Sequence, residues 1–309
     1  MIQIRKTVPD ADYLRICEIN NQFDPEPIVA ESYLPKMKVV PKGWQVLRLT
    51  GLVDGEIVGF AHLRRNSGMF SDTFLLTLAV DEVHQGRGYG AALLDSVLEQ
   101  APEMGARRIV PIVRETHARA PKFFESRGFD TKMSLREGYL ELEDFEAEIE
   151  ELPEGYHLVR WSDIEDNEEN REKFAVAFLK MDADEPGSLL LGGFDRETIE
   201  RDAFDADTSD PRYLYLVECD GEWVAHHQIQ MNEPGDWEMT GITFTGTLPA
   251  HRRLGLATAL KNLGALEAKE LGAKRIMTHN DSSNLGMLTI NRKQGYVEEP
   301  GWLMMLREL

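Results

Sequence analysis

Apolar residues along the chain alternate between strand-like runs and helix-like stretches. In the first half, the strand-like runs are 46–52, 56–63, 73–80 and 108–113, and the helix-like stretches are 91–98 and 118–127. The dipeptide Asp54-Gly55 separates the first two runs and suits the positive φ angles of a hairpin turn. In the second half, Leu256, Leu260, Leu263 and Leu266 form one helical stripe. The pattern predicts an α/β fold with mixed sheets.

The chain contains an internal duplication. His84–Gly90 recurs as His251–Ala257 at an offset of 167 residues. The same offset relates Gly105–Ile109 to Gly272–Ile276 and Arg127–Phe129 to Gln294–Tyr296. Upstream, Asp54–Gly59 matches Asp220–Ala225 at an offset of 166, which we interpret as a hairpin followed by a short loop change. The sequence therefore predicts two copies of one domain.

The acidic segment 141–155 is the best place for the break between the copies. Its like charges repel one another, and Pro153 and Gly155 end any regular element. We place the boundary near Ala147, which predicts an N-terminal domain over 1–147 and a C-terminal domain over 148–309. Because two fused copies imitate a dimer, a monomer or a homodimer is expected.

Composition narrows the classes of partner. The chain has 34 Lys and Arg against 54 Asp and Glu, a net charge of −20, which disfavours nucleic acid as a partner. Two cysteines, Cys17 and Cys219, predict neither a disulfide framework nor a metal site. The chain shows no signal-peptide pattern and no apolar run of the roughly 18 residues that a membrane helix needs. We expect a cytoplasmic protein that binds no metal and no membrane.

Each copy carries a strand, a small-residue turn and a helix in succession. Such a turn presents unpaired backbone N–H groups at the positive end of a helix dipole, which is a phosphate site. Gly88 and Gly90, or Gly255 and Ala257, let a pyrophosphate approach the backbone closely. Neither copy has the spacing of a Walker loop or of a dinucleotide-binding fold.

The segments 85–90 and 252–257 share the pattern Gln or Arg, two residues, Gly, one residue, Gly or Ala. This pattern resembles the GNAT superfamily of N-acetyltransferases. Gly128-Phe129 and Gly295-Tyr296, which follow a distal helix, also fit the family. Two tandem copies are similar to the tandem acetyltransferases of the mycothiol synthase type.

The resemblance implies acetyl-CoA as the cofactor and two GNAT domains in tandem. The positions that it implies for the pyrophosphate are Gln85, Gly86, Arg87, Gly88, Tyr89 and Gly90 in the first copy and Arg252, Arg253, Leu254, Gly255, Leu256 and Ala257 in the second. Those that it implies for the pantetheine arm are Leu78 and Val80, or Thr245 and Thr247.

Acetyl transfer to an amine needs a base for the amine proton and a donor for the thiolate. The resemblance implies a carboxylate on the strand before the turn as base, which is Glu238 in the second copy or Asp72 in the first. The pair His226-His227 is an alternative base, and a structural role for these histidines competes with it.

The family's acid tyrosine maps onto Phe124 and Asn291, so neither copy has it. Asn291 can orient a water but is no acid, and Tyr89 or Tyr296 is a possible substitute. A family asparagine that contacts the cofactor maps onto His117 and Asn284. Because the second copy keeps this polar wall, we predict that it is the catalytic one.

The sequence therefore predicts an acetyl-CoA-dependent N-acetyltransferase that acts on a primary amine of a small molecule. The alternative is a non-catalytic acyl-CoA-binding or scaffold protein of the same fold, which the missing tyrosine favours. A third possibility is that both copies are active on different amines. The acceptor itself is left open, because variable loops build such pockets.

Overall fold

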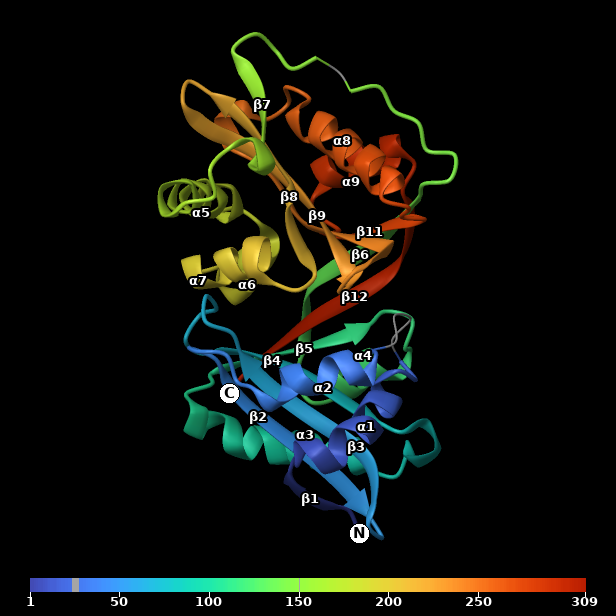
Figure 1. The fold of residues 1–309 in the computed structure, drawn as a ribbon. Coiled ribbons are helices and arrows are strands. Elements are labelled where there is room, and N and C mark those ends of the chain that lie inside the picture. Colours follow the sequence, from blue (N-terminus) through green and yellow to red (C-terminus); the bar gives the residue numbers. More distant parts are fainter. Residues whose placement is uncertain (24–27, 150) are drawn as a thin grey trace. The chain divides into compact units, whose positions relative to one another are not determined.

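A computed structural model describes residues 1–23, 28–149 and 151–309 (Figure 1). The chain forms two compact units, which we call unit 1 (Met1–Ser134 with Trp302–Leu309) and unit 2 (Leu135–Gly301). The elements up to the division are β1 (Gln3–Lys6), α1 (Pro9–Asn20), α2 (Ala30–Lys38), β2 (Gln45–Val53), β3 (Glu56–Arg65), β4 (Thr73–Val80), α3 (Tyr89–Gln100), β5 (Arg108–Arg114), α4 (Arg119–Glu125) and β6 (Asp130–Glu141). The later ones are β7 (Tyr156–Arg160), α5 (Glu168–Asp182), α6 (Pro186–Leu191), α7 (Arg196–Glu200), β8 (Ser209–Cys219), β9 (Glu222–Glu233), β10 (Asp236–Thr247), α8 (Leu256–Glu270), β11 (Arg275–Asp281), α9 (Leu285–Gln294) and β12 (Val297–Glu308).

The compact units divide the chain within strands β6 and β12, whereas the predicted boundary lies at residue 147. The reason is strand pairing. Residues 302–308 of β12 pair antiparallel with β5 and belong to unit 1, so the C-terminus in Figure 1 lies among the strands of unit 1. Residues 135–141 of β6 pair antiparallel with β11 and belong to unit 2. Within the predicted linker, residue 150 lies outside the described residues.

The sheet of unit 1 has the order β1-β2-β3-β4-β5-β12, and only β4 and β5 are parallel. Leu47, Leu49, Ala61 and Leu63 pack with α3 on one face. The alternating position Phe60 faces the other side, where it packs with Tyr13 of α1. The parallel pairing of β4 with β5 ends at Leu76↔Pro111, so β4 runs on to Val80 with that edge unpaired by β5.

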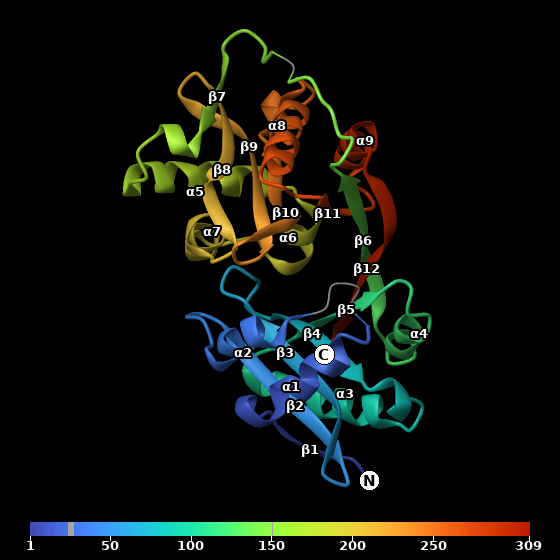
Figure 2. The same cartoon turned by 45° about the vertical axis from the view of Figure 1, so that its right-hand side comes forward.

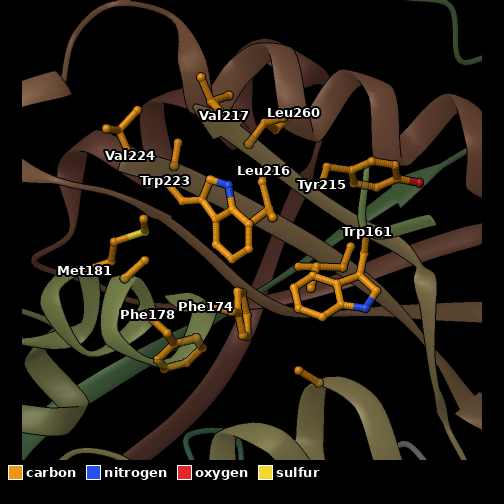
Figure 3. Close-up of a cluster of buried hydrophobic side chains, with 14 of the residues drawn as sticks. Trp161, Phe174, Phe178, Met181, Tyr215, Leu216, Val217, Trp223, Val224 and Leu260 are labelled. Carbon is orange, nitrogen blue, oxygen red and sulfur yellow. The ribbon is translucent and has the colours of Figure 1, made fainter. Parts of the chain in front are cut away.

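Unit 2 repeats this plan with the order β6-β11-β10-β9-β8-β7, in which only β10 and β11 are parallel. Figure 2 shows α5 and α8 on opposite sides of β8 and β9. The core on the α5 side is rich in aromatic side chains, among them Trp161, Phe174, Phe178 and Trp223 (Figure 3).

The one-residue change in the repeat offset lies inside a strand. In unit 1 the register of β3 with β4 is continuous, but in unit 2 the register of β9 with β10 shifts between Ile242 and Phe244. The extra residue is therefore Thr243, in a β-bulge. The predicted loop change was wrong, because the equivalent paired residues on either side of the loop, Arg64↔Leu75 in unit 1 and Gln230↔Gly241 in unit 2, keep an equal separation along the chain.

Candidate active site

The turn between β4 and α3 in unit 1 has the geometry of an anion cradle. Gly86 and Gly88 have φ angles of +76° and +84°, which favour glycine, and a Cβ at either would meet no atom within 4 Å. The first helical bond of α3 runs from the Ala92 N–H to the Gly88 carbonyl. The N–H groups before Ala92 therefore have no acceptor within the helix and point toward the turn.

Gln85 and Arg252 hold the two turns against their strands. The Gln85 amide donates to the carbonyl of Val80 at 3.1 Å, and the Arg252 Nε donates to the carbonyl of Thr247 at 3.0 Å. The two terminal nitrogens of Arg252 also pair with Asp184 at 2.6 and 2.7 Å. The Arg252 guanidinium is thus engaged by protein groups at the position where the sequence predicts phosphate contact.

The turn of unit 2 repeats the same backbone with less glycine. Gly255 has φ +81°, and Arg253 has φ +66° at the position that Gly86 occupies in unit 1. Arg253 therefore adopts a left-handed conformation that costs about 1 kcal/mol in a residue with a Cβ. The first helical bond of α8, from Ala259 N–H to the Gly255 carbonyl, matches that of α3.

A cavity of about 890 Å³ lies in unit 1 beside its turn. Seven of the predicted cofactor residues line it: Leu78, Val80, Gln85, Gly86, Gly88, Tyr89 and Gly90. It extends along the edge of β4 that β5 leaves unpaired and reaches α4. Arg87, also predicted, instead bonds the Val83 carbonyl at 3.2 Å.

Several residues of the cavity wall are not marked by any pattern in the sequence. Asn20 is the last residue of α1 and Phe23 lies in the turn after it, and Arg119 and Trp302 come from α4 and β12. No motif marks these positions, since each reaches the cavity only through the tertiary fold. His117 also lines the cavity, and its ring lies 5.4 Å from that of Phe23.

The two predicted carboxylate bases lie far from the turns. Glu238 is exposed at the start of β10 and pairs with Lys274 at 2.5 Å. Thr247 lies nine positions further along this strand, about 30 Å away. Asp72 pairs in the same way with Arg108 at 2.8 Å, beside the start of β4. Each ion pair links two neighbouring strands that run parallel. The positions of both acids do not support a role as base.

The predicted asparagines of unit 2 are engaged by the protein. The Asn284 side chain caps α9 by accepting from the Met287 N–H at 3.2 Å. The Asn291 amide donates to Asn280 at 2.6 Å, and its buried Oδ1 has no hydrogen-bond partner among the described residues. Asn291 thus keeps one free acceptor in the interior of unit 2.

His226 and His227 face opposite sides of β9 and are both buried. The His226 ring stacks on Phe244 at 5.1 Å, and burial lowers the pKa of His226 to about 3. His227 Nδ1 lies 2.8 Å from the Thr245 hydroxyl, and burial lowers the pKa of His227 well below its usual value. Both rings are therefore neutral, and their burial supports the structural role.

A buried lysine of unit 2, Lys261, occupies a position that is apolar in unit 1. Lys261 of α8 is 2% exposed, and its Nζ lies 4.7 Å from the ring centroid of Tyr296. The position equivalent to Lys261 in unit 1 is Leu94, which is fully buried in the core. Burial lowers the pKa of Lys261 to about 7 and raises the pKa of Tyr296. Tyr296 is thus a poorer acid than a free tyrosine.

Comparison with known proteins decides the family. The model of the acetyltransferase (GNAT) family matches residues 15–129 and again 139–296. The chain belongs to the acetyltransferase (GNAT) family. It is an acyltransferase with two copies of the family's fold, and the mixed α/β fold class and tandem arrangement predicted from the sequence are confirmed.

Relatives of similar length support this assignment. The chain is 28% identical over 254 residues to a mycothiol acetyltransferase of Amycolatopsis mediterranei. The alignment covers 80% of this chain and 80% of the relative. It is 26% identical to that of Saccharomonospora viridis over 78% of this chain and 76% of the relative. The two matches to the family model and these two relatives identify the chain as a tandem acetyltransferase.

Solved structures share the fold over nearly the whole chain. A GCN5-related N-acetyltransferase from Sphaerobacter thermophilus aligns with a TM-score of 0.75 at 17% identity, over 99% of this chain and 95% of that one. A tandem GNAT protein from the clavulanic acid biosynthesis pathway aligns with a TM-score of 0.75 at 18% identity, over 100% and 98%. None of the helices within the described residues is long and apolar enough to cross a membrane.

Proposed function

We propose that the protein transfers the acetyl group of acetyl-CoA to a primary amine of a small molecule, and that the cavity of unit 1 holds the acetyl-CoA. The observation that carries this proposal is the cavity itself. It joins the Gln85–Gly90 turn to the edge of β4 from Thr77 to Val80. A long cofactor with a pyrophosphate at one end and amide groups along its arm needs such a site.

The residues of the cavity fit the chemical groups of acetyl-CoA. The open space at Gly86 and Gly88 leaves the backbone N–H groups accessible to a pyrophosphate. The strand edge beyond Leu76 offers backbone donors and acceptors to the amides of the pantetheine arm. Arg119 and Arg127 add positive charge to the wall in a chain whose net charge is −20.

Acetyl-CoA supplies the acetyl group as a thioester. Transfer forms a bond from nitrogen to the acetyl carbon and breaks the bond from that carbon to sulfur; the amine loses a proton and the thiolate gains one. Backbone N–H groups on the β4 edge polarise the carbonyl. Phe124 is 3% exposed and packs in the core, so in unit 1 we assign the thiolate's proton to water.

The second candidate function is acyl-CoA binding without transfer, and Phe124 and Asn291 at the acid positions favour it. Thiol release separates the two. A transferase releases coenzyme A from acetyl-CoA when a panel of amines is added, whereas a binding protein shows affinity for acetyl-CoA and no amine-dependent release. Binding by calorimetry and release with the wild type therefore test the proposed function directly.

Substitution of Gly88 by Trp is expected to weaken acetyl-CoA binding by at least about tenfold, because the side chain fills the space that the pyrophosphate needs. Gly105→Trp is the matched control, since Gly105 has the same φ of +84° and an equally open surrounding but lies outside the cavity wall. Calorimetric titration of both variants measures the difference.

The equivalent pair in unit 2, Gly255→Trp with Gly272→Trp as its control, tests the prediction that the second copy is catalytic. If Gly255→Trp alone abolishes amine-dependent thiol release, the reaction takes place in unit 2. Equal affinity of the Gly88→Trp and Gly105→Trp variants for acetyl-CoA would contradict the cofactor site in unit 1.

A further inference from the structure

The face of the unit 1 sheet that lies toward α1 carries two arginines. Arg48 of β2 is paired in register with His62 of β3, and Arg64 follows two residues later on the same strand. Side chains two apart on a strand share a face, so all three point to the same side. Tyr13 of α1 lies on this side, with its ring 6.1 Å from that of His62.

Several polar atoms of this group are buried and have no hydrogen-bond partner among the described residues. They are the Tyr13 hydroxyl, Arg48 Nε and His62 Nε2. Tyr13 is 1% exposed and His62 is 8% exposed. An unsatisfied buried polar group destabilises the fold, so three together in one place indicate a site built for a further group.

The carboxylate on this face is already engaged. Asp12 of α1 accepts two bonds from Arg5, at 2.6 and 2.8 Å, and one from Thr50 at 3.1 Å. Arg48 forms no ion pair with any described residue, and Arg64 bonds the neutral amide of Asn66 at 3.0 Å. The two guanidinium groups therefore lack a protein counter-ion in the described part of a chain with 54 acidic residues.

The environment of the two arginines lowers the pKa values of groups on this face. Burial, followed by the charges of Arg48 and Arg64, lowers the pKa of His62 to about 3, so this ring is neutral. Burial also lowers the pKa of Arg64. A half-buried pair of like charges is costly without an anion, and a bound carboxylate or phosphate removes that cost.

Unit 2 has uncharged residues at the equivalent positions. The residues equivalent to Arg48, His62 and Arg64 are Leu214, Gln228 and Gln230. The Gln228 amide donates to the Ala203 carbonyl at 2.7 Å, and Gln230 accepts from the Thr243 hydroxyl at 3.0 Å. The same fold thus accommodates uncharged residues at these positions.

The cationic group adjoins the cavity of unit 1. His62 pairs in register with Thr77 of β4, and Thr77 lines the cavity together with Asn20 at the end of α1 and Phe23 in the turn after it. Leu75, two residues before Thr77 and on the same face of β4, pairs in register with Arg64. An acetyl acceptor bound at this end of the cavity, beside β4, is therefore one strand away from Arg64 on β3 and two strands away from Arg48 on β2.

We propose that Arg48 and Arg64, with the Tyr13 hydroxyl, bind an anionic group of the acetyl acceptor, so that the substrate of unit 1 is an amine that also carries a carboxylate or a phosphate. This inference rests on the proposed function, since it names the class of substrate for the same site. Arg guanidinium groups recognise both anions through paired hydrogen bonds.

The test compares 3-aminopropanoate, 3-aminopropyl phosphate and propylamine as acceptors in the thiol-release assay. We expect one of the two anionic amines to have a kcat/KM at least about tenfold above that of propylamine. The double variant Arg48→Gln/Arg64→Gln is expected to lose this preference, so that its kcat/KM for the anionic amine falls to that for propylamine. A higher kcat/KM for 3-aminopropanoate would identify the bound anion as a carboxylate, and a higher kcat/KM for 3-aminopropyl phosphate would identify it as a phosphate.

Arg65→Gln is the matched control. Arg65 lies next to Arg64 on the opposite face of β3, and its guanidinium bonds Gln45 and the Gly43 carbonyl. It is expected to keep the wild-type preference. An equal or better rate with propylamine, or a preference that survives in the double variant, overturns the inference.

A binding measurement separates this inference from the proposed function. Inorganic phosphate and propanoate are expected to raise the melting temperature of the wild type and of Arg65→Gln by more than they raise that of the double variant. The turn at Gly86 and Gly88 is unchanged in all three proteins, so any phosphate bound there contributes equally to each. If acetyl-CoA binds but no amine releases thiol, the proposed function fails while this shift still tests the anion site. Equal shifts in the wild type and the double variant overturn the site.

Discussion

Removal of residues 302–309 is expected to unfold unit 1 and abolish the acetyl-CoA binding that we propose for it, although 134 residues of that unit remain. Met305 of this segment is fully buried in the core of unit 1 beside Leu303. Loss of one such side chain costs about 2–5 kcal/mol. The deletion also removes the pairing of β12 with β5 and the Trp302 wall of the cavity.

These losses together are comparable with the whole stability of a domain, about 5–15 kcal/mol. Differential scanning calorimetry of the chain ending at Gly301 is expected to show one transition in place of two, and titration is expected to detect no acetyl-CoA binding in unit 1. Deletion of Leu309 alone is the control, because this residue is 45% exposed and contributes one backbone bond to Arg107. Two transitions in the chain ending at Gly301 would show that β12 is dispensable.

Lys261→Met is expected to stabilise unit 2 by on the order of 4 kcal/mol at pH 7. Lys261 lies at the position of a core leucine in unit 1, and the ring of Tyr296 and the neutral ring of His227 are the titratable groups that interact with it. Burial lowers its pKa from 10.5 to about 7, because the charged form is poorly solvated there. Methionine fills the space without a charge.

The sign of the pH effect follows from this shift. Between pH 10.5 and about 7 the unfolded chain binds a proton at Lys261 that the folded chain does not, so wild-type stability falls as the pH drops through this window. Below about pH 7 both states are protonated and the cost is constant. Lys261→Met removes this slope from the transition of unit 2.

Thermal denaturation from pH 6 to pH 10.5 measures the slope. Lys293→Met is the control, since Lys293 is exposed on α9 of the same unit and its replacement leaves the slope as in the wild type. An unchanged slope in Lys261→Met, or a lower melting temperature at pH 7, would contradict the assignment of a buried lysine with a lowered pKa.

Local signals in the sequence determined the family and the turn. The repeat of 84–90 at 251–257 predicted two copies, and the small residues at 88 and 255 predicted the sharp turn into each helix. These predictions succeed because a left-handed turn and a helix start depend on residues that are adjacent in the chain. Seven of the cofactor residues predicted in the first copy line one cavity for the same reason.

The general base illustrates what a linear pattern misses. Glu238 was predicted from its place before the turn, but a strand of twelve residues puts it at the far end of β10, where Lys274 engages it. The cationic group around Arg48 and Arg64 gave no signal, because arginines in half-exposed strands are common. Its meaning depends on which atoms have no partner once the helices are packed.

The sequence by itself determined the duplication, the α/β class and the left-handed turns at Gly88 and Gly255, since each rests on contacts between residues close in the chain. Only the tertiary structure decided that residues 302–309 complete the sheet of unit 1, that Thr243 is a bulge, and that Lys261 is buried. Strand pairing and burial join residues far apart in sequence, and their energies depend on partners that no local pattern specifies.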